Sequence, residues 1–202
     1  MAAARAPDQP LTLLVVTMAI IRRLAAGFTL IEVLLVVSLG AVLTGMTLFA
    51  FQAAQRQIRG DANLRLLTGL LETAREQALT ERRSIEIRFV GANEMLTVRR
   101  EVPAGETALA RVFFEGNGRY TLWPGVPDSP DGFGNTAPID FGTATATMFG
   151  PDGMFVDAAG VPVNGTVFFG VPSQSETARA VTVFGATGRV RGYRWNGSAW
   201  VQ

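Results

Sequence analysis

Residues 27–51 read GFTLIEVLLVVSLGAVLTGMTLFAF, and this apolar stretch decides how the rest of the chain is organised. At 1.5 Å per helical residue, residues 28–51 would span about 36 Å, against a bilayer hydrocarbon core of about 30 Å. The stretch therefore predicts a transmembrane helix. Glu32 is its only charged residue. Because a carboxylate in lipid costs about 2.5–3.5 kcal/mol at a helix centre and less near an end, we expect Glu32 to have a partner.

The start of this stretch carries a family resemblance. Gly27-Phe28-Thr29-Leu30-Ile31-Glu32, followed by an uninterrupted apolar helix, resembles the class III signal of type IV prepilins and type II secretion pseudopilins. The resemblance implies that prepilin peptidase cuts between Gly27 and Phe28 and that Phe28 is then N-methylated. It also implies that Glu32 pairs with the terminal amine of a neighbouring subunit. An ordinary signal anchor with a chance glutamate is the alternative interpretation.

Residues 1–27 are expected to form the prepilin leader. Residues 11–21 are apolar but too short to span a bilayer, and they resemble the core of a secretory signal. A start at Met18 would leave the short basic leader MAIIRRLAAG, and we favour that start. Arg22 and Arg23 predict a cytoplasmic N terminus and a C-terminal domain on the other side of the membrane. The resemblance implies that this membrane is the bacterial inner membrane, that the protein is single-pass with a periplasmic domain, and that it later enters a filament.

Composition argues against an enzyme. The 202 residues contain no histidine and no cysteine, which removes the usual zinc and copper ligands, the thiol nucleophile and the commonest general base. No G-x-S-x-G motif is present, and we predict neither cofactor nor metal. Residues 28–202 keep fifteen arginines and sixteen acidic residues, so overall charge does not predict nucleic-acid binding. Residues 179–202, in contrast, contain four arginines and no acid.

The helical period continues beyond the apolar stretch, over residues 52–83. Small or apolar residues recur there every four positions, with Leu67 and Leu71 beside them: Ile58, Ala62, Leu66, Leu70, Ala74 and Ala78. This pattern predicts an amphipathic continuation of the same helix. We expect its apolar face to be buried under the chain's own domain and not in a separate coiled coil. No proline lies between residues 28 and 83, so no sharp kink is expected.

Residues 84–202 are expected to form an antiparallel β domain. Residues 85–89 alternate apolar and charged side chains and are followed by a turn and by residues 95–99, which is typical of a hairpin. Further strands are expected at residues 110–114, 139–149, 166–171, 180–184, 189–195 and 199–201. Residues 123–138 are rich in proline and glycine and predict a long exposed loop. The fold class is therefore α+β and pilin-like.

Two features of the β domain are weaker candidates for sites. Residues 128–135 contain Asp128, Asp131 and Asn135, whose oxygens suit calcium, but their spacing does not fit an EF-hand. Tyr193, Trp195 and Trp200 are expected to pack on the sheet and not to bind a ligand.

The C-terminal arginines are the stronger candidate. A strand over residues 189–195 would place Arg189 and Arg191 on one face with Tyr193 and Trp195, and Arg194 on the other face. Guanidinium groups beside aromatic rings suit phosphates and bases. The alternative is a turn followed by solvated arginines on an edge strand.

A second resemblance joins these features. The signal, the helix with Ala74-Arg75-Glu76-Gln77-Ala78, and residues 180–184 followed by Thr187-Gly188-Arg189-Val190-Arg191 resemble the FimT/GspH family of minor pilins. In the FimT branch a GRxR motif is associated with DNA binding during natural transformation, and Gly188, Arg189 and Arg191 match it. A glycine-arginine turn is also common in the secretion branch.

The sequence therefore predicts a minor pilin or pseudopilin of a type IV pilus or a type II secretion system, with a DNA-binding minor pilin as the alternative. Its expected partners are prepilin peptidase, other pilin subunits and the inner membrane. In the alternative, DNA binds through Gly188, Arg189, Arg191 and Arg194.

Overall fold

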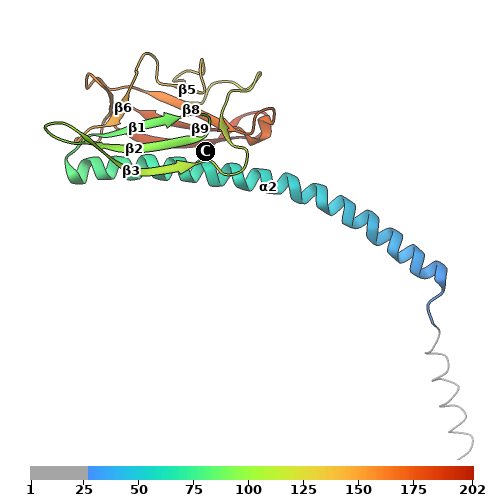
Figure 1. Ribbon diagram of the computed structural model, residues 1–202. Coiled ribbons are helices and arrows are strands. Elements are labelled where there is room, and N and C mark those ends of the chain that lie inside the picture. The colour runs from blue at the N-terminus through green and yellow to red at the C-terminus, as the bar shows by residue number, and fades with distance from the viewer. Residues whose placement is uncertain (1–26) are drawn as a thin grey trace, which may run out of the picture. The chain divides into compact units, whose positions relative to one another are not determined.

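The computed structural model describes residues 27–202. The expected start at Met18, the apolar residues 11–21, and Arg22 and Arg23 lie outside the described residues. The chain divides into an N-terminal unit that ends at Phe51 and a second unit from Gln52 to Gln202. Within the described residues, the elements are one long α-helix, eleven short strands and one 3₁₀ turn (Figure 1).

Helix α2 runs from Leu30 to Glu81, close to the expected limits of 28 and 83. Thr29 caps its first turn, because the Thr29 hydroxyl oxygen accepts a hydrogen bond from the backbone N–H of Glu32 at 3.3 Å. The segment Leu30–Leu48 is long and apolar enough to cross a membrane, and none of it is buried in the described chain. An apolar surface of this size needs lipid or other subunits to cover it.

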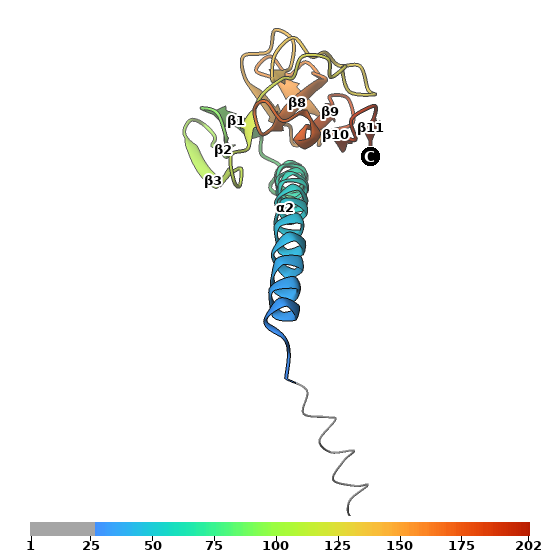
Figure 2. The same cartoon turned by 90° about the vertical axis from the view of Figure 1, so that its right-hand side faces the viewer.

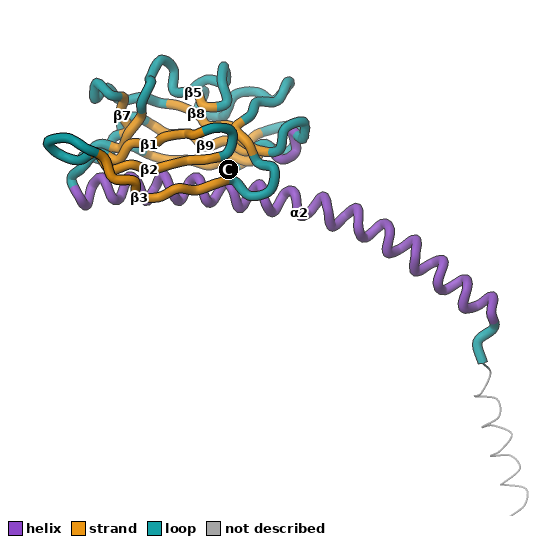
Figure 3. The backbone as a smooth tube through the Cα atoms, in the orientation of Figure 1, coloured by secondary structure: helices purple, strands orange, loops and turns teal. Residues whose placement is uncertain are grey.

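The second unit contains two antiparallel sheets, which confirms the predicted α+β class (Figure 3). The first sheet has the order β3-β2-β1-β6-β7 and the second the order β11-β10-β9-β8-β4, with β5 also paired to β8. The strands of the first sheet are β1 (Ile85–Val90), β2 (Glu94–Arg100), β3 (Glu106–Phe113), β6 (Thr147–Phe149) and β7 (Phe155–Asp157). Those of the second are β4 (Arg119–Tyr120), β5 (Ile139–Asp140), β8 (Gly165–Gly170), β9 (Arg179–Phe184), β10 (Arg189–Trp195) and β11 (Trp200–Val201). The 3₁₀ turn η1 (Ser175–Thr177) connects β8 to β9.

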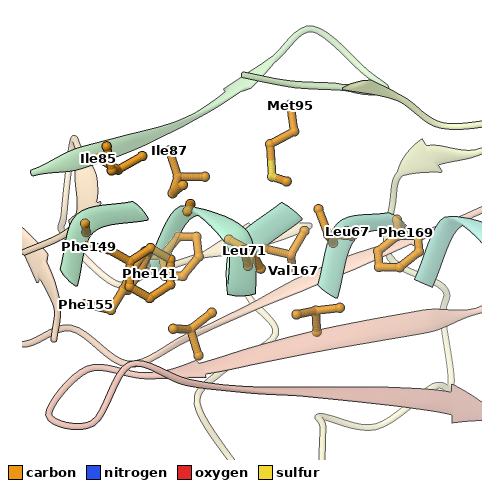
Figure 4. Close-up of a cluster of buried hydrophobic side chains, with 14 of the residues drawn as sticks. Leu67, Leu71, Ile85, Ile87, Met95, Phe141, Phe149, Phe155, Val167 and Phe169 are labelled. Atoms are coloured by element: carbon orange, nitrogen blue, oxygen red, sulfur yellow. The ribbon is translucent and has the colours of Figure 1, made fainter. Parts of the chain in front are cut away.

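The C-terminal part of α2 forms one core with both sheets. Strands β1 to β3 lie to one side of the helix and β8 to β11 to the other (Figure 2). Leu67, Leu71, Ala74 and Ala78 are at most 1% exposed. They pack with apolar residues from both sheets, among them Ile85, Ile87, Met95, Phe149, Phe155, Val167 and Phe169 (Figure 4). The expectation that this helix face is buried under its own domain is confirmed.

The predicted limits of the buried face were wrong at its N-terminal end. Ile58 is 65% exposed, whereas Gly60 and Asn63 occupy the buried line that leads to Leu67. The reason is helical geometry. A strict four-residue repeat gains about 40° per step, so residues 20 positions apart, such as Ile58 and Ala78, point about 200° apart. The true face mixes spacings of three and four.

The single strand predicted over residues 139–149 was also wrong. The structure divides this segment into β5, which pairs with β8, and β6, which pairs with β1 and β7. The chain turns between them at Gly142, whose φ is +62° and whose N–H donates to the Asp140 carboxylate at 3.1 Å. Strands β4 and β7 were not predicted, and β3 begins at Glu106, four residues before the expected start.

A group of ion pairs crosses the first sheet on the face opposite Ile85 and Ile87. The Glu86 carboxylate, 9% exposed, lies 2.6 Å from Arg88 Nε and 2.9 Å from a terminal nitrogen of Arg100. The hydrogen bonds from Arg88 lower the pKa of Glu86 most, the Arg100 hydrogen bond lowers it further, and burial opposes both. This carboxylate therefore stabilises the folded state only while it is ionised.

The ion pairs of Glu86 predict an acid-sensitive β domain. Folding lowers the pKa of Glu86. The contribution of the ionised carboxylate to the free energy of unfolding is therefore fully present above the unfolded-state pKa of 4.5, and it is lost as pH falls through the lower folded-state pKa. We expect Glu86→Gln to flatten the acid loss of unfolding free energy, measured by denaturant unfolding followed through tryptophan fluorescence. Glu72→Gln, on the exposed side of α2, is the control. If the free energy of unfolding falls equally steeply with pH in Glu86→Gln and in wild type, Glu86 is not the group responsible for the acid sensitivity.

Candidate functional sites

The predicted processing site, Gly27 and Phe28, lies just before helix α2. Gly27 and Phe28 are outside the helix, and both are exposed. Phe28 is 79% exposed, and a Cβ built on Gly27 would meet no described atom within 4 Å. Nothing in the described chain therefore shields the bond between these two residues.

Glu32 lies in the first turn of α2, three residues after the capping Thr29. Its apolar neighbours are exposed: Leu30 by 78%, Ile31 by 73% and Leu34 by 58%. Among the described residues Glu32 forms no ion pair. The structure thus places one carboxylate within an apolar helix surface, with no partner for it in the described chain.

Gly188 has a structural role in the turn between β9 and β10. Its φ is +61°, and its N–H donates to the Phe184 carbonyl at 2.7 Å. A Cβ at this position would lie 2.0 Å from the Gly153 carbonyl oxygen and 2.8 Å from Arg75 Nε. Arg75 Nε itself donates to that carbonyl at 3.1 Å. Only glycine allows the turn to pack this closely against helix α2 and residue 153.

Arg191 is engaged by an aspartate from the long loop. One terminal nitrogen of its guanidinium lies 2.6 Å from the Asp131 carboxylate, which is 6% exposed. The hydroxyls of Tyr193 and Thr182 donate to the same carboxylate at 2.9 and 2.6 Å. The structure therefore brings Arg191 and Tyr193 together on one face, and uses them to hold residues 128–135 against β9 and β10.

The carboxylate oxygens of Asp128 and Asp131, which were considered as calcium ligands, accept hydrogen bonds from the chain itself. Asp131 accepts the three bonds from the strands, while the Asp128 carboxylate accepts backbone N–H groups of Ser129 at 2.6 Å and Gly134 at 2.8 Å. No group of three or more acidic side chains that could hold a metal ion occurs in the part of the chain that the structure describes. Donors of the chain itself organise this loop.

The other two arginines lie elsewhere and also have acidic neighbours. Arg189 is exposed and lines an open hollow together with Glu72 and Glu76 of α2. Arg194, 47% exposed, lies 4.0 Å from Asp61. The three arginines are thus not gathered into one cluster, and the carboxylates close to Arg191 and Arg194 weaken the attraction of these two for a phosphate.

The C-terminal aromatic residues pack as expected. Tyr193 and Trp195 are 5% and 7% exposed, and they form a small core with Trp123 and Phe168. Trp200 packs edge-on against Trp195, with ring centres 5.5 Å apart, and its indole N–H donates to the Pro127 carbonyl at 2.9 Å. These rings fix the end of the second sheet.

Sequence reasoning missed a buried ion pair between β9 and α2. Arg179 is 0% exposed and lies across Gly60, where a Cβ would come within 3.1 Å of its guanidinium. Its Nε donates to the Asp61 carboxylate at 2.9 Å, and another nitrogen donates to the Ala178 carbonyl at 2.9 Å. Burial lowers the pKa of Arg179, and the charge of Asp61 opposes that effect.

One sequence signal pointed to Arg179. It extends the apolar run of residues 180–184 by one position and stands between two alanines, which is where a buried strand residue is expected. Its partner is 118 residues away, and no local pattern links the two.

Comparison with known proteins agrees with the N-terminal site. Residues 22–48 match the family model for the prokaryotic N-terminal methylation motif. No curated protein matches the chain, and no solved structure does. The motif supports a type IV pilin-like or pseudopilin subunit that is processed by prepilin peptidase, and the exposed apolar helix fits membrane anchoring. The match ends at residue 48, so it does not describe the β domain.

The Arg179–Asp61 pair predicts an asymmetry between single and double variants. Asp61→Ala leaves a buried guanidinium without its counter-charge, which costs about 3–5 kcal/mol in fully buried pairs. Because Asp61 is 34% exposed, we expect about 2–3 kcal/mol, measured by denaturant unfolding. Adding Arg179→Met should recover part of this loss, while Glu72→Ala should change little. If the double variant is less stable than Asp61→Ala alone, the loss in Asp61→Ala does not come from an unpaired buried guanidinium.

Proposed function

We propose that this protein is a minor pilin or pseudopilin that is built into a type IV pilus or a type II secretion pseudopilus. Prepilin peptidase cuts between Gly27 and Phe28, and Phe28 becomes the N-methylated first residue. Before assembly the chain is held in the bacterial inner membrane by α2, with its leader in the cytoplasm and its β domain in the periplasm. Its role is structural and not enzymatic.

One observation carries this proposal: the helix segment Leu30–Leu48, which lies within the matched motif, has no buried residue. None of Leu30–Leu48 is buried, and the segment has an apolar surface interrupted by Glu32. Lipid covers such a surface before assembly. After assembly, the same surface packs against the helices of neighbouring subunits.

In this proposal Glu32 determines how far the helix of one subunit is displaced along the helix of its neighbour in the filament. A carboxylate in lipid is unfavourable unless it is paired, so a subunit gains most where a cation meets Glu32. After cleavage, the terminal amine of Phe28 in a neighbouring subunit supplies such a cation. A displacement of one helical turn would separate the two charges by about 5.4 Å and leave both unpaired.

Substitution of Glu32 tests this role. We expect Glu32→Ala to leave membrane insertion and cleavage intact but to reduce co-purification of the subunit with assembled filaments. Gly27→Leu should block cleavage. Ser38→Ala is a matched control, because the Ser38 hydroxyl donates to the Leu35 carbonyl of its own helix at 2.9 Å. If Glu32→Ala subunits enter filaments as well as wild type does, the pairing account is wrong.

DNA uptake is a second candidate function, and the exposed Arg189 beside the Gly188 turn is the observation in its favour. The carboxylates beside Arg191 and Arg194 argue against this function. A bound phosphate at Arg191 would compete with Asp131, which is held by two further hydroxyl donors. For this reason we prefer the filament role without DNA binding.

A gel shift of the full chain in detergent, at two salt concentrations, separates these functions. A DNA-uptake pilin would bind with strong salt sensitivity and lose binding in the Arg189→Ala/Arg191→Ala variant. We expect no such binding. Gly188→Ala should unfold at a lower temperature than wild type in either case, because its Cβ has no space. Loss of binding in that variant alone would therefore not identify a DNA contact.

A further inference from the structure

The turn between β10 and β11 holds an Asn-Gly pair whose side-chain amide receives several hydrogen bonds. The turn consists of residues 196–199, and all four are exposed. The Asn196 side-chain oxygen accepts from the Ser198 N–H at 2.9 Å, from the Ser198 hydroxyl at 3.0 Å and from the Ala199 N–H at 2.8 Å. The Asn196 N–H donates to the Ala199 carbonyl at 3.1 Å, which closes the turn. One amide oxygen therefore lies where three donors converge.

The backbone nitrogen of Gly197 lies beside this amide. The hydrogen bond from the Ser198 N–H to the Asn196 side chain forms an Asx turn, which folds the side chain back across the peptide that joins residues 196 and 197. The Gly197 N–H has no hydrogen-bond partner within residues 27–202. Gly197 has a φ of +99°, and a Cβ built on it would meet no atom within 4 Å. Solvent can therefore reach this nitrogen.

The three donors suit a reaction at the amide carbon of Asn196. Attack on that carbon by the neighbouring backbone nitrogen moves negative charge onto the side-chain oxygen. Donors about 2.7–3.1 Å from a developing oxyanion stabilise it, and here they are in place before the reaction starts. Because the two reacting atoms belong to adjacent residues in a closed turn, little further ordering is needed to bring them together.

We propose that this turn promotes its own deamidation at Asn196. The Gly197 nitrogen loses its proton to hydroxide and forms a bond to the side-chain carbon of Asn196. The amide nitrogen takes up a proton from water and leaves as ammonia, which regenerates the hydroxide and leaves a cyclic succinimide. Water then opens the ring at either of its carbonyl carbons, so that residue 196 becomes aspartate or isoaspartate. The net reaction consumes water, releases ammonia and involves no oxidation or reduction.

Two other Asn-Gly pairs in the chain lack this arrangement. They lie at residues 117–118 and 164–165. At the first, the Gly118 N–H donates to the Glu115 carbonyl at 3.4 Å, so the attacking nitrogen is engaged. At the second, Gly165 is buried in β8, and a Cβ there would lie 2.1 Å from the Phe141 ring. This packing leaves no room for the backbone to form a ring with residue 164, so both pairs serve as internal comparisons.

Deamidation would change the end of the second sheet. Strands β10 and β11 are joined by only two residue pairs, Arg194 with Val201 and Trp195 with Trp200. Isoaspartate places an additional carbon atom in the main chain of the turn that sets this register. Either product also adds a carboxylate to residues 179–202, which contain four arginines and no acid. The reaction would thus give aged subunits a different charge and a looser C-terminal strand.

Peptide mapping by mass spectrometry tests this proposal. Full-length protein in detergent and the same protein unfolded in urea are incubated in mildly alkaline buffer, and aspartate plus isoaspartate are quantified at residues 117, 164 and 196 over time. We expect residue 196 to react about fivefold faster in the folded protein than in urea, because only folding aligns its donors. Residues 117 and 164 should react more slowly when folded. A folded-state rate at residue 196 equal to or below its rate in urea would overturn the proposal.

A serine substitution separates the donors from simple exposure. Ser198→Ala removes the hydroxyl donor and keeps both backbone donors, so we expect the ratio of folded to urea rates at residue 196 to fall about threefold, as for one net hydrogen bond. Ser175→Ala, at another exposed serine, is the matched control and should leave that ratio unchanged. An unchanged ratio in Ser198→Ala would show that exposure alone sets the rate, and the proposed role of the turn would be wrong.

Discussion

The burial of one face of α2 between two sheets is the interaction on which the second unit depends. Leu67 and Leu71 have no exposed surface, and both sheets direct apolar residues at them. Each sheet alone would leave that face in water. Near the other end of the contact, Arg179 lies on Gly60 and pairs with Asp61, so that a charge as well as an apolar surface fixes where β9 crosses the helix. Removing either contact would loosen the helix from its domain.

The apolar half of the same helix is built for different surroundings. Between Leu30 and Leu48 no residue is buried, and Glu32 has no partner in the described chain. Over residues 60–78 the helix buries its apolar face against the chain's own sheets. Over residues 30–48 its apolar surface is uncovered and Glu32 is unpaired, so the monomer alone does not supply the contacts that this part of the helix needs. Membrane anchoring and filament assembly are two ways to complete it, and the proposed function uses them in succession.

Several features could be predicted from the sequence because their signals are local. The apolar run, the four-residue spacing and the alternation of residues 85–89 predicted the helix, the C-terminal end of its buried face at Ala74 and Ala78, and the first hairpin. The expected processing residues rest on a six-residue match and stay a prediction. In contrast, residues 139–149 divide between two sheets at a turn where Gly142 has a φ of +62° and its N–H donates to Asp140, and alternation does not reveal this turn. The pairing of Arg179 with Asp61 and of Arg191 with Asp131 joins residues 118 and 60 positions apart.

The C-terminal motif shows why a matching pattern does not fix a role. Gly188 is required by packing against Gly153, and Arg191 holds the long loop through Asp131, so two of its three defining residues have structural duties. The N-terminal signal has no such competing explanation, because Gly27, Phe28 and Glu32 make no contact that would require them in the described chain. Mass spectrometry of the N-terminal peptide from the mature protein tests the account most directly. The proposed processing predicts a mature chain that begins with N-methylated Phe28. An unmethylated chain that retains Gly27 in cells with active prepilin peptidase would contradict it.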